Sequence, residues 1–162
     1  MPQRMACWKA QRISLLIFMM VQGVMYSVLG LRPHIETAVE YHYTKLGIRQ
    51  FIVGGYGNFD CIAGSSVKAV KLLSPDIDLK LLLPYHPVER TVEAPPGFDG
   101  TIYPEGMENV PRKLAIVRAN QYMVRNADTV ICFVKHFGNT RALLEQAQKR
   151  SDLYVQNLAE EI

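Results

Sequence analysis

The sequence predicts a three-layer α/β domain, with a mostly parallel sheet and helices on both faces. Short apolar runs alternate along the chain with segments whose apolar residues recur at helical spacing, as expected when each strand is followed by a helix that crosses back over the sheet. Two of these runs lead into glycine turns, at Gly54 and at Gly138. The length of 162 residues, with 49% hydrophobic and 20% charged content, fits one domain with a single core.

The N-terminal region allows two interpretations. Residues 13–31 contain no charged side chain and follow three cations, which is the pattern of a short membrane span with a positive flank. Within them, VMYSVLG (24–30) has the composition of a first strand that ends in glycine. A span would remove that strand from the sheet, so we favour the strand over membrane contact. Residues 1–22 then form an apolar extension, as a surface or membrane-associated helix or an upstream start, and 23–162 a single domain.

The next elements follow from spacing and from helix-ending residues. Residues 34–48 carry apolar side chains at helical spacing and reach Gly47, so they predict a helix. FIVGG (51–55) predicts a strand, and a second helix opens at Asp60 and ends before Pro75. The nearly continuous apolar run 79–84 predicts a parallel strand that is covered on both faces.

The second half continues the alternation after a long loop. Five prolines between residues 84 and 110 predict the longest loop of the domain. Pro111 suits the first turn of a helix, and 129–134 predicts a strand. A helix over 138–150 and a last strand over 153–158 complete the pattern.

The charge distribution argues against nucleic acid as the main ligand. The chain has 18 Lys and Arg and 15 Asp and Glu residues, and the excess of three cations lies in the first 23 residues. The remaining chain is balanced and shows no cluster of cations that would neutralise several phosphates of a duplex.

Cysteine and histidine usage gives no sign of a metal site. Cys7, Cys61 and Cys132 form no CxxC pair, and the four histidines have no ligand spacing. Cys61 and Cys132 lie in apolar segments, where we expect small buried side chains. This low count fits a reducing cytoplasm.

The two glycine turns are the candidate ligand site. GGYGNFD (54–60) and KHFGNTRALLE (135–145) each join a strand to a helix, so both offer backbone N–H groups and a helix N-terminus to a phosphate. Two such turns that converge would hold a phosphorylated sugar or a nucleotide. The first turn is not GxGxxG, because Asp60 stands at the third glycine position. The chain also lacks GxxxxGK[ST], which excludes a P-loop NTPase.

Several segments resemble the SLOG superfamily, most closely its small stand-alone bacterial members. The resemblance rests on GGYGNFD, LLLPY, YPEGMENVPRKLAIVRANQYMVRNADTVICFV and GNTRALLEQAQKR, and it covers about residues 24–158. It implies a Rossmann-like domain that binds nucleotides or nucleotide-derived ligands such as ADP-ribose compounds. Some members, the Lonely Guy phosphoribohydrolases, cleave the N-glycosidic bond of nucleoside monophosphates.

The resemblance also implies the residues of the site. The expected nucleotide-binding residues are Gly54, Gly55, Tyr56, Gly57, Asp60, Asn120, Gly138, Asn139 and Thr140. Glu145 matches the glutamate that follows the second glycine turn, and its carboxylate would stabilise positive charge on the ribose during glycosidic cleavage. Arg118 would bind phosphate as a bidentate donor.

Each of these roles has a structural alternative. Glu145 can pair with Arg141 or Lys149 on the helix surface, Asp60 can cap the helix that it opens, and Arg118 can lie on a solvated helix face. The hydrolases carry an arginine and a lysine where this chain has Ala119 and Asn120, and Phe137 replaces a glycine of their second loop.

The leading functional hypothesis is a cytoplasmic nucleotide-ligand-binding protein, acting as a sensor, with no cofactor and no metal. Hydrolysis of nucleoside monophosphates is the alternative, because the departures above affect catalysis more than binding. A membrane-tethered or partner-binding module is a third hypothesis, based on residues 13–31. Family members commonly pair through helices, so a homo-oligomer is compatible with all three.

Overall fold

The computed structural model describes residues 12–18, 28–135 and 139–162. Gly138, Cys7 and residues 19–27, which include most of the expected strand 24–30, lie outside these ranges. Within the described ranges, no helix is long and apolar enough to cross a membrane.

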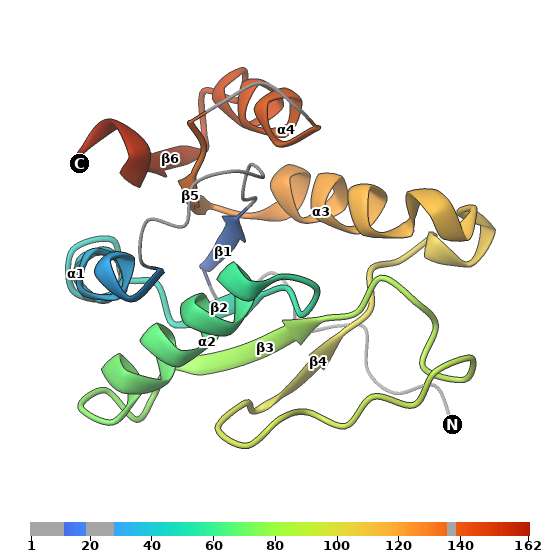
Figure 1. Ribbon diagram of the computed structural model, residues 1–162, viewed down its shortest axis with the longest axis horizontal. Coiled ribbons are helices and arrows are strands. Elements are labelled where there is room, and N and C mark those ends of the chain that lie inside the picture. Colours follow the sequence, from blue (N-terminus) through green and yellow to red (C-terminus); the bar gives the residue numbers. More distant parts are fainter. Residues whose placement is uncertain (1–11, 19–27, 136–138) are drawn as a thin grey trace.

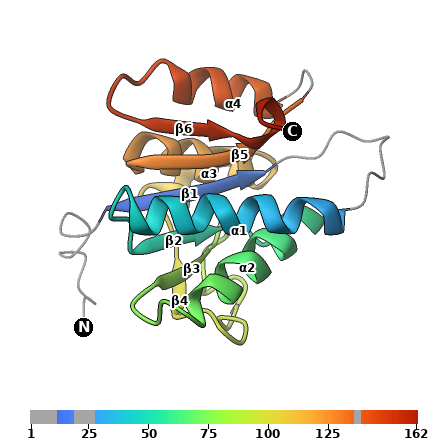
Figure 2. The ribbon, with the colours of Figure 1, turned by 90° about the vertical axis from the view of Figure 1, so that its left-hand side faces the viewer.

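Six parallel strands form one sheet in the order β4-β3-β2-β1-β5-β6. Figure 2 shows them stacked in this order from β6 at the top to β4 at the bottom. The predicted α/β class with a parallel sheet is therefore confirmed. The strands are β1 (Ile13–Phe18), β2 (Gln50–Val53), β3 (Asp78–Leu82), β4 (Gly100–Ile102), β5 (Thr129–Phe133) and β6 (Tyr154–Asn157).

The first strand lies earlier in the chain than the sequence predicted. β1 pairs with β2 on one side and β5 on the other, while residues 28–30, the end of the expected strand 24–30, are helical. ISLLIF therefore supplies a central strand, and the expectation that residues 1–22 are appended to the domain is wrong for 13–18. Both segments are apolar, and tertiary pairing decided between them.

The entry into β1 is held by Asp128. Its Oδ2 accepts a hydrogen bond from the Ile13 amide at 2.7 Å, and its own amide donates to the Ile13 carbonyl at 2.9 Å. Ile13 is 3% exposed. This exchange fixes the register of β1 against β5.

The proline-rich loop contains a strand that the sequence did not reveal. β4 has three residues and pairs with β3 at the edge of the sheet. Its sequence GTI is too short for a periodicity signal, which explains the omission.

Two helices cover each face of the sheet. α1 (Val28–Thr44) and α2 (Asn58–Lys71) lie in front of it in Figure 2, and α3 (Ala115–Asn126) lies behind it, where it packs beside α4 (Asn139–Gln148). Each pair encloses a separate apolar core. One core contains Ile35, Val39, Phe51, Val67 and Leu79, and the other contains Met123, Val124, Val130, Leu143 and Leu144.

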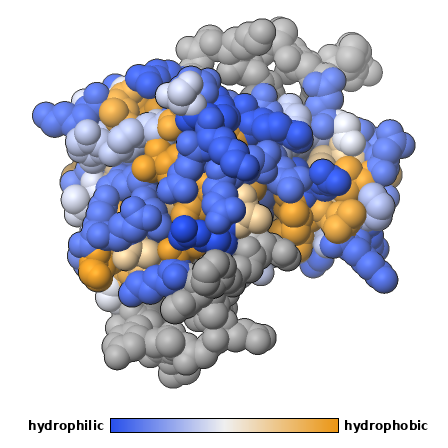
Figure 3. Space-filling model, turned by 90° about the horizontal axis from the view of Figure 1, so that it is seen from above, coloured by the Kyte–Doolittle hydropathy of each residue, from blue (hydrophilic) through white to orange (hydrophobic). Residues whose placement is uncertain are grey.

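The two outer strands of the sheet lie on opposite sides of the molecule. β4 and the loops around it lie at the lower right of Figure 1, while β6 and the C-terminus lie at the upper left. The face that carries α3 and α4, seen in Figure 3, is mostly hydrophilic with separate apolar patches.

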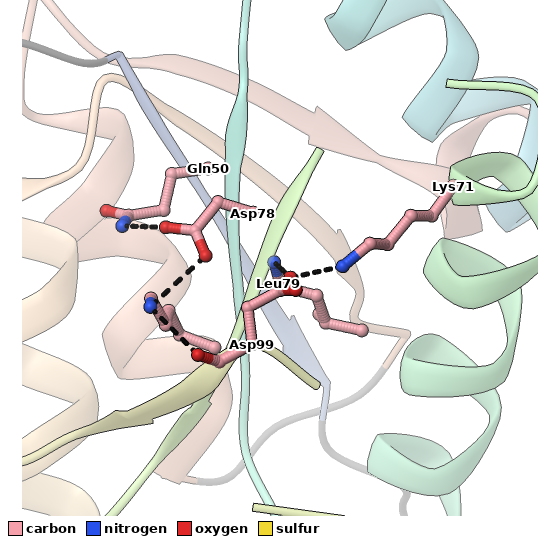
Figure 4. A network of polar contacts seen from close by, with 6 residues as sticks. Gln50, Lys71, Asp78, Leu79 and Asp99 are labelled. Carbon is pink, nitrogen blue, oxygen red and sulfur yellow. Dashed lines mark hydrogen bonds and ion pairs between the residues drawn. The ribbon is translucent and has the colours of Figure 1, made fainter. Parts of the chain in front are cut away.

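The amino edge of the sheet carries a closed polar network between β2, β3 and β4 (Figure 4). Gln50 donates to Asp78 at 2.8 Å, and Lys80 bridges Asp78 at 3.2 Å and the carbonyl of Asp99 at 3.3 Å. The Asp99 carboxylate accepts from the buried amide of Leu79 at 2.8 Å and pairs with Lys71. Burial opposes ionisation of Asp99, but these donors and cations hold the pKa of its carboxyl below the usual range.

A buried histidine links α1 to the same edge. His42 is fully buried, its Nε2 donates to Gln156 Oε1 at 3.0 Å, and its Nδ1 accepts from the hydroxyl of Thr129 at 3.0 Å. Gln156 in turn donates to Glu161. Burial, which outweighs the hydrogen bond to Gln156, lowers the pKa of His42 from 6.5 to about 4. His42 is therefore neutral near pH 7.

Candidate functional site

Both glycine turns leave the same edge of the sheet, as the sequence predicted. Every neighbouring pair of strands is parallel, so the turn that contains Tyr56 and the turn before Asn139 lie at the carboxyl edge, after β2 and β5. Connections lead from β1 outward to β2, β3 and β4, but from β5 to β6 on the other side. Ligands of open α/β sheets bind at such a reversal of strand order.

Beneath this edge, an aromatic ring from the first turn of α2 stacks on a ring at the end of β5. Phe59 in the first turn of α2 stacks on Phe133 at the end of β5, with ring centroids 6.3 Å apart and an interplanar angle of 13°. Phe59 is 3% exposed, so this part of the space between the turns is packed. A ligand would have to lie outside the two rings, toward solvent.

Asp60 caps the helix that follows the first turn. Its carboxylate accepts from the Tyr56 amide at 2.9 Å and from the Gly57 amide, which is the N-cap of α2. An acid at the third helical position commonly bonds the N-cap amide in this way. Burial raises the pKa of Asp60, and the two amides oppose the rise. The capping alternative therefore describes Asp60, and its contact with a ligand stays a prediction.

The three glycines of the first turn differ in the contacts that an added Cβ atom would make. A Cβ on Gly54 would lie 3.0 Å from Asp60 Oδ2, and a Cβ on Gly55 would lie 3.1 Å from Leu81 Cδ1. Gly57 has an extended φ of −151° and no neighbour closer than 3.8 Å to such a Cβ. Packing thus explains Gly54 and Gly55, whereas a Cβ on Gly57 would make only ordinary van der Waals contacts with Asp60 and Phe59.

The second turn leads into α4, which begins at Asn139. Thr140 is 6% exposed, and its hydroxyl has no hydrogen-bond partner among the described residues. It borders a cavity of about 10 Å³ whose other lining residues, among them Cys132 and Leu143, are apolar. A buried hydroxyl without a partner is destabilising.

The side-chain contacts of the proposed catalytic residues, Glu145 and Arg118, lie within their own helices in the described structure. Glu145 is exposed, pairs with Arg141 at 3.4 Å, and lies six residues into α4, roughly 9 Å along the helix from Asn139. Arg118 is exposed in the first turn of α3 and donates to Gln121 at 3.2 Å. Asn120 is half-buried on the same helix. These contacts match the structural alternatives.

Sequence reasoning missed a residue that fixes the second turn. Asn157, 6% exposed at the end of β6, donates to the Val134 carbonyl at 3.1 Å and accepts from the Val134 amide at 2.9 Å. This clamp holds the chain as it leaves β5. The signal in the sequence is an asparagine directly after an apolar strand, which is too common to single out.

The described residues offer little to a metal or a thiol mechanism. Among them, no group of three or more His, Cys, Asp and Glu side chains could hold a metal ion. Cys132 is buried, as expected, and burial raises the pKa of its thiol to about 12. Cys61 is exposed, so the expectation of a buried side chain was wrong there: it lies on the outer face of α2.

An open groove lies along α2, away from the turns. Its volume is about 720 Å³, and its lining includes Lys68, Lys71, Phe98 and Asp99. Lys71 pairs with Asp99, and Lys68 donates to the Pro96 carbonyl at 3.3 Å and lies over the Phe98 ring. Lys71 is thus neutralised by Asp99, and we place no ligand in this groove.

Comparisons with known proteins give only a weak structural similarity. No family model matches the sequence, and no curated protein sequence matches it. The crystal structure of S. aureus TarJ in complex with NADPH is similar with a TM-score of 0.41 and 14% identity, over 85% of this chain and 46% of TarJ. The chain thus spans about half the length of TarJ, and the similarity identifies no ligand for it.

Proposed function

We propose that this chain binds a nucleotide or a nucleotide-derived ligand at the carboxyl edge of its sheet, as a sensor related to the SLOG superfamily. The phosphate would lie between Gly57 and the first turn of α4. The observation that carries the proposal is that α2 and α4 both begin at this edge, after strands that flank β1. Helix N-termini at the same edge of a sheet favour an anion there.

Two further features support a phosphate at this position. The Thr140 hydroxyl has no partner among the described residues, and a phosphate oxygen would accept from it if the first turn of α4 opens slightly. Neither the extended φ of Gly57 nor a close neighbour requires a glycine there, since a Cβ would make only ordinary contacts from 3.8 Å outward. Both would be explained by a bound group.

Hydrolysis of a glycosidic bond has less support. Glu145 is engaged by Arg141, and Arg118 by Gln121, so the two groups that the reaction would need are already occupied on separate helices. Binding requires only amides and dipoles, whereas catalysis requires charges placed within a fraction of an ångström.

A ligand screen tests the proposal. Purified protein is mixed with nucleoside mono- and diphosphates, NAD and ADP-ribose, and thermal unfolding and calorimetric titration are measured. A ligand at about a hundred times its Kd adds about 2.7 kcal/mol to the free energy of unfolding and raises the Tm by several degrees. A folded protein that responds to none of these compounds contradicts the proposal.

Release of free base tests the alternative. Incubation with nucleoside monophosphates, followed by chromatography, is expected to leave them intact. Base release that disappears in Glu145→Gln would replace the sensor proposal with an N-glycosidase.

A further inference from the structure

Three adjacent strands are each followed closely by a tyrosine at the carboxyl edge. Tyr56 and Tyr85 come three residues after β2 and β3, and Tyr103 directly follows β4. Because β2, β3 and β4 are neighbours in the sheet, the three rings lie in sequence along one edge. We call Tyr56, Tyr85 and Tyr103 the tyrosine row.

The inner part of the row contains an aromatic pair and an arginine. The rings of Tyr56 and Tyr85 meet edge to face, with centroids 5.8 Å apart and an interplanar angle of 79°. The guanidinium carbon of Arg112, just before α3, lies 5.2 Å from the centroid of Tyr85. Tyr56 remains 44% exposed, so much of its ring is accessible to a second planar group.

Arg112 forms no ion pair with an acidic side chain among the described residues. It is exposed, and no carboxylate in the described ranges lies within 4.0 Å of it, unlike Arg32, Arg49 and Arg150. Stacking on Tyr85 holds the guanidinium in place while its N–H donors remain available.

The outer end of the row is acidic. Burial raises the pKa of Tyr103, and the negative charges of Glu108 and Glu89 raise it further. The His86 ring meets the Tyr103 ring edge to face, with centroids 5.2 Å apart. A phosphate would be repelled there. A neutral aromatic ring is the better occupant of the row, with the phosphate at the glycine turn beside Tyr56.

We propose that Tyr56, Tyr85 and Arg112 form a base subsite that selects an oxo-substituted nucleobase, such as guanine or hypoxanthine. The inference rests on the nucleotide-binding function proposed above and specifies its ligand. Every base has a face that stacks on tyrosine, but an arginine offers donors only. It matches the O6 and N7 acceptors of guanine, whereas adenine presents a donor at the corresponding position.

Stacking is tested with Tyr56→Ala and the matched control Tyr41→Ala, whose ring on α1 is 42% exposed. Titration calorimetry is performed with ribose 5-phosphate and with GMP. We expect wild type and Tyr41→Ala to bind GMP at least about tenfold more tightly than ribose 5-phosphate, and Tyr56→Ala to lose this difference. The ratio of the two affinities in each protein is the readout.

Base selection is tested with Arg112→Ala and the control Arg125→Ala, an exposed arginine in the last turn of α3. Wild type and the control should prefer GMP over AMP by about tenfold, and Arg112→Ala should bind the two equally. Far-ultraviolet circular dichroism checks that each variant is folded.

The outcomes separate this inference from the function on which it rests. If ribose 5-phosphate binds as tightly as GMP, or if wild type binds AMP as well as GMP, the base subsite is wrong and phosphate binding stands. A Tyr56→Ala variant that loses both ligands equally also overturns the subsite. Absence of binding by any of the three compounds overturns the base subsite, and the full ligand screen described above then decides whether the proposed function stands.

Discussion

The two edges of the sheet differ in how their polar groups are satisfied. At the amino edge, Gln50, Asp78, Lys80 and Asp99 bond one another, and the pKa of Asp99 is lowered. At the carboxyl edge, the Thr140 hydroxyl has no partner among the described residues, Arg112 has no carboxylate there, and the pKa of Asp60 is raised. The polar groups named at the amino edge bond one another, whereas those at the carboxyl edge could still bond a ligand.

This difference separates stability from binding. Groups that are fully paired within the chain contribute to folding, while groups that are left unpaired cost free energy unless a ligand completes them. Substitutions at the amino edge should therefore lower stability and leave binding intact. Removal of the unpaired groups at the carboxyl edge should weaken binding without lowering stability.

The largest expected effect on stability is that of pH through His42. Its pKa is about 4 in the folded chain and 6.5 in the unfolded chain, so between these values the unfolded chain binds the additional proton. The free energy of unfolding should fall by about 1.4 kcal/mol per pH unit as pH decreases through this window. Urea denaturation at a series of pH values measures the slope. His42→Gln should remove most of it, and an unchanged slope would contradict the assignment.

Removal of the Asp99 carboxylate should have the next largest effect. Asp99→Ala leaves the buried Leu79 amide without its acceptor and should cost about 1–3 kcal/mol in urea denaturation. Asp152→Ala, which breaks a solvent-exposed pair with Arg150, is the control and should change stability little. Ligand affinity should be the same in both variants. Reduced affinity in Asp99→Ala alone would break the division between the edges.

Thr140→Val should stabilise the protein. Valine keeps the shape of threonine and removes a buried hydroxyl for which the described residues supply no partner, so the free energy of unfolding should rise by about 1 kcal/mol. Ser65→Ala is a control on α2, since the Ser65 hydroxyl donates to the Cys61 carbonyl at 2.8 Å and is exposed. A loss of stability in Thr140→Val would show that the hydroxyl is satisfied in solution.

The smallest stability effect is expected at Gly57. The free energy of unfolding of Gly57→Ala should stay within about 0.5 kcal/mol of the wild-type value. Alanine is a poorer N-cap than glycine, but it also reduces the conformational freedom of the unfolded chain, and the two effects offset each other. Gly55→Ala brings a Cβ within 3.1 Å of Leu81 and should cost about 1 kcal/mol. Thermal denaturation compares the two, and calorimetry should show weakened phosphate binding in Gly57→Ala. Normal binding there would remove Gly57 from the site.

The sequence predicted most of the fold because its helices and inner strands carry clear patterns. α2, α3, β2, β3 and β5 were found close to their observed bounds. The misplaced element was β1, since residues 13–31 are apolar throughout and only pairing with β2 and β5 selects 13–18. β4 has three residues, which is too few to show a period.

The site was predicted unevenly. Strand-to-helix turns can be recognised from glycines, so the common edge of Tyr56 and Asn139 followed from the parallel sheet. The role of Asp60 depends on which amides its carboxylate reaches, and the isolation of Arg112 depends on which acids lie near it. Neither is encoded in local sequence spacing.

Titration of the wild type and Thr140→Val with GMP tests the central claim most directly. We expect a 1:1 complex with the wild type and at least tenfold weaker binding by Thr140→Val, although the variant is the more stable protein. Equal affinities, or no heat with either protein, would show that the carboxyl edge does not hold the phosphate.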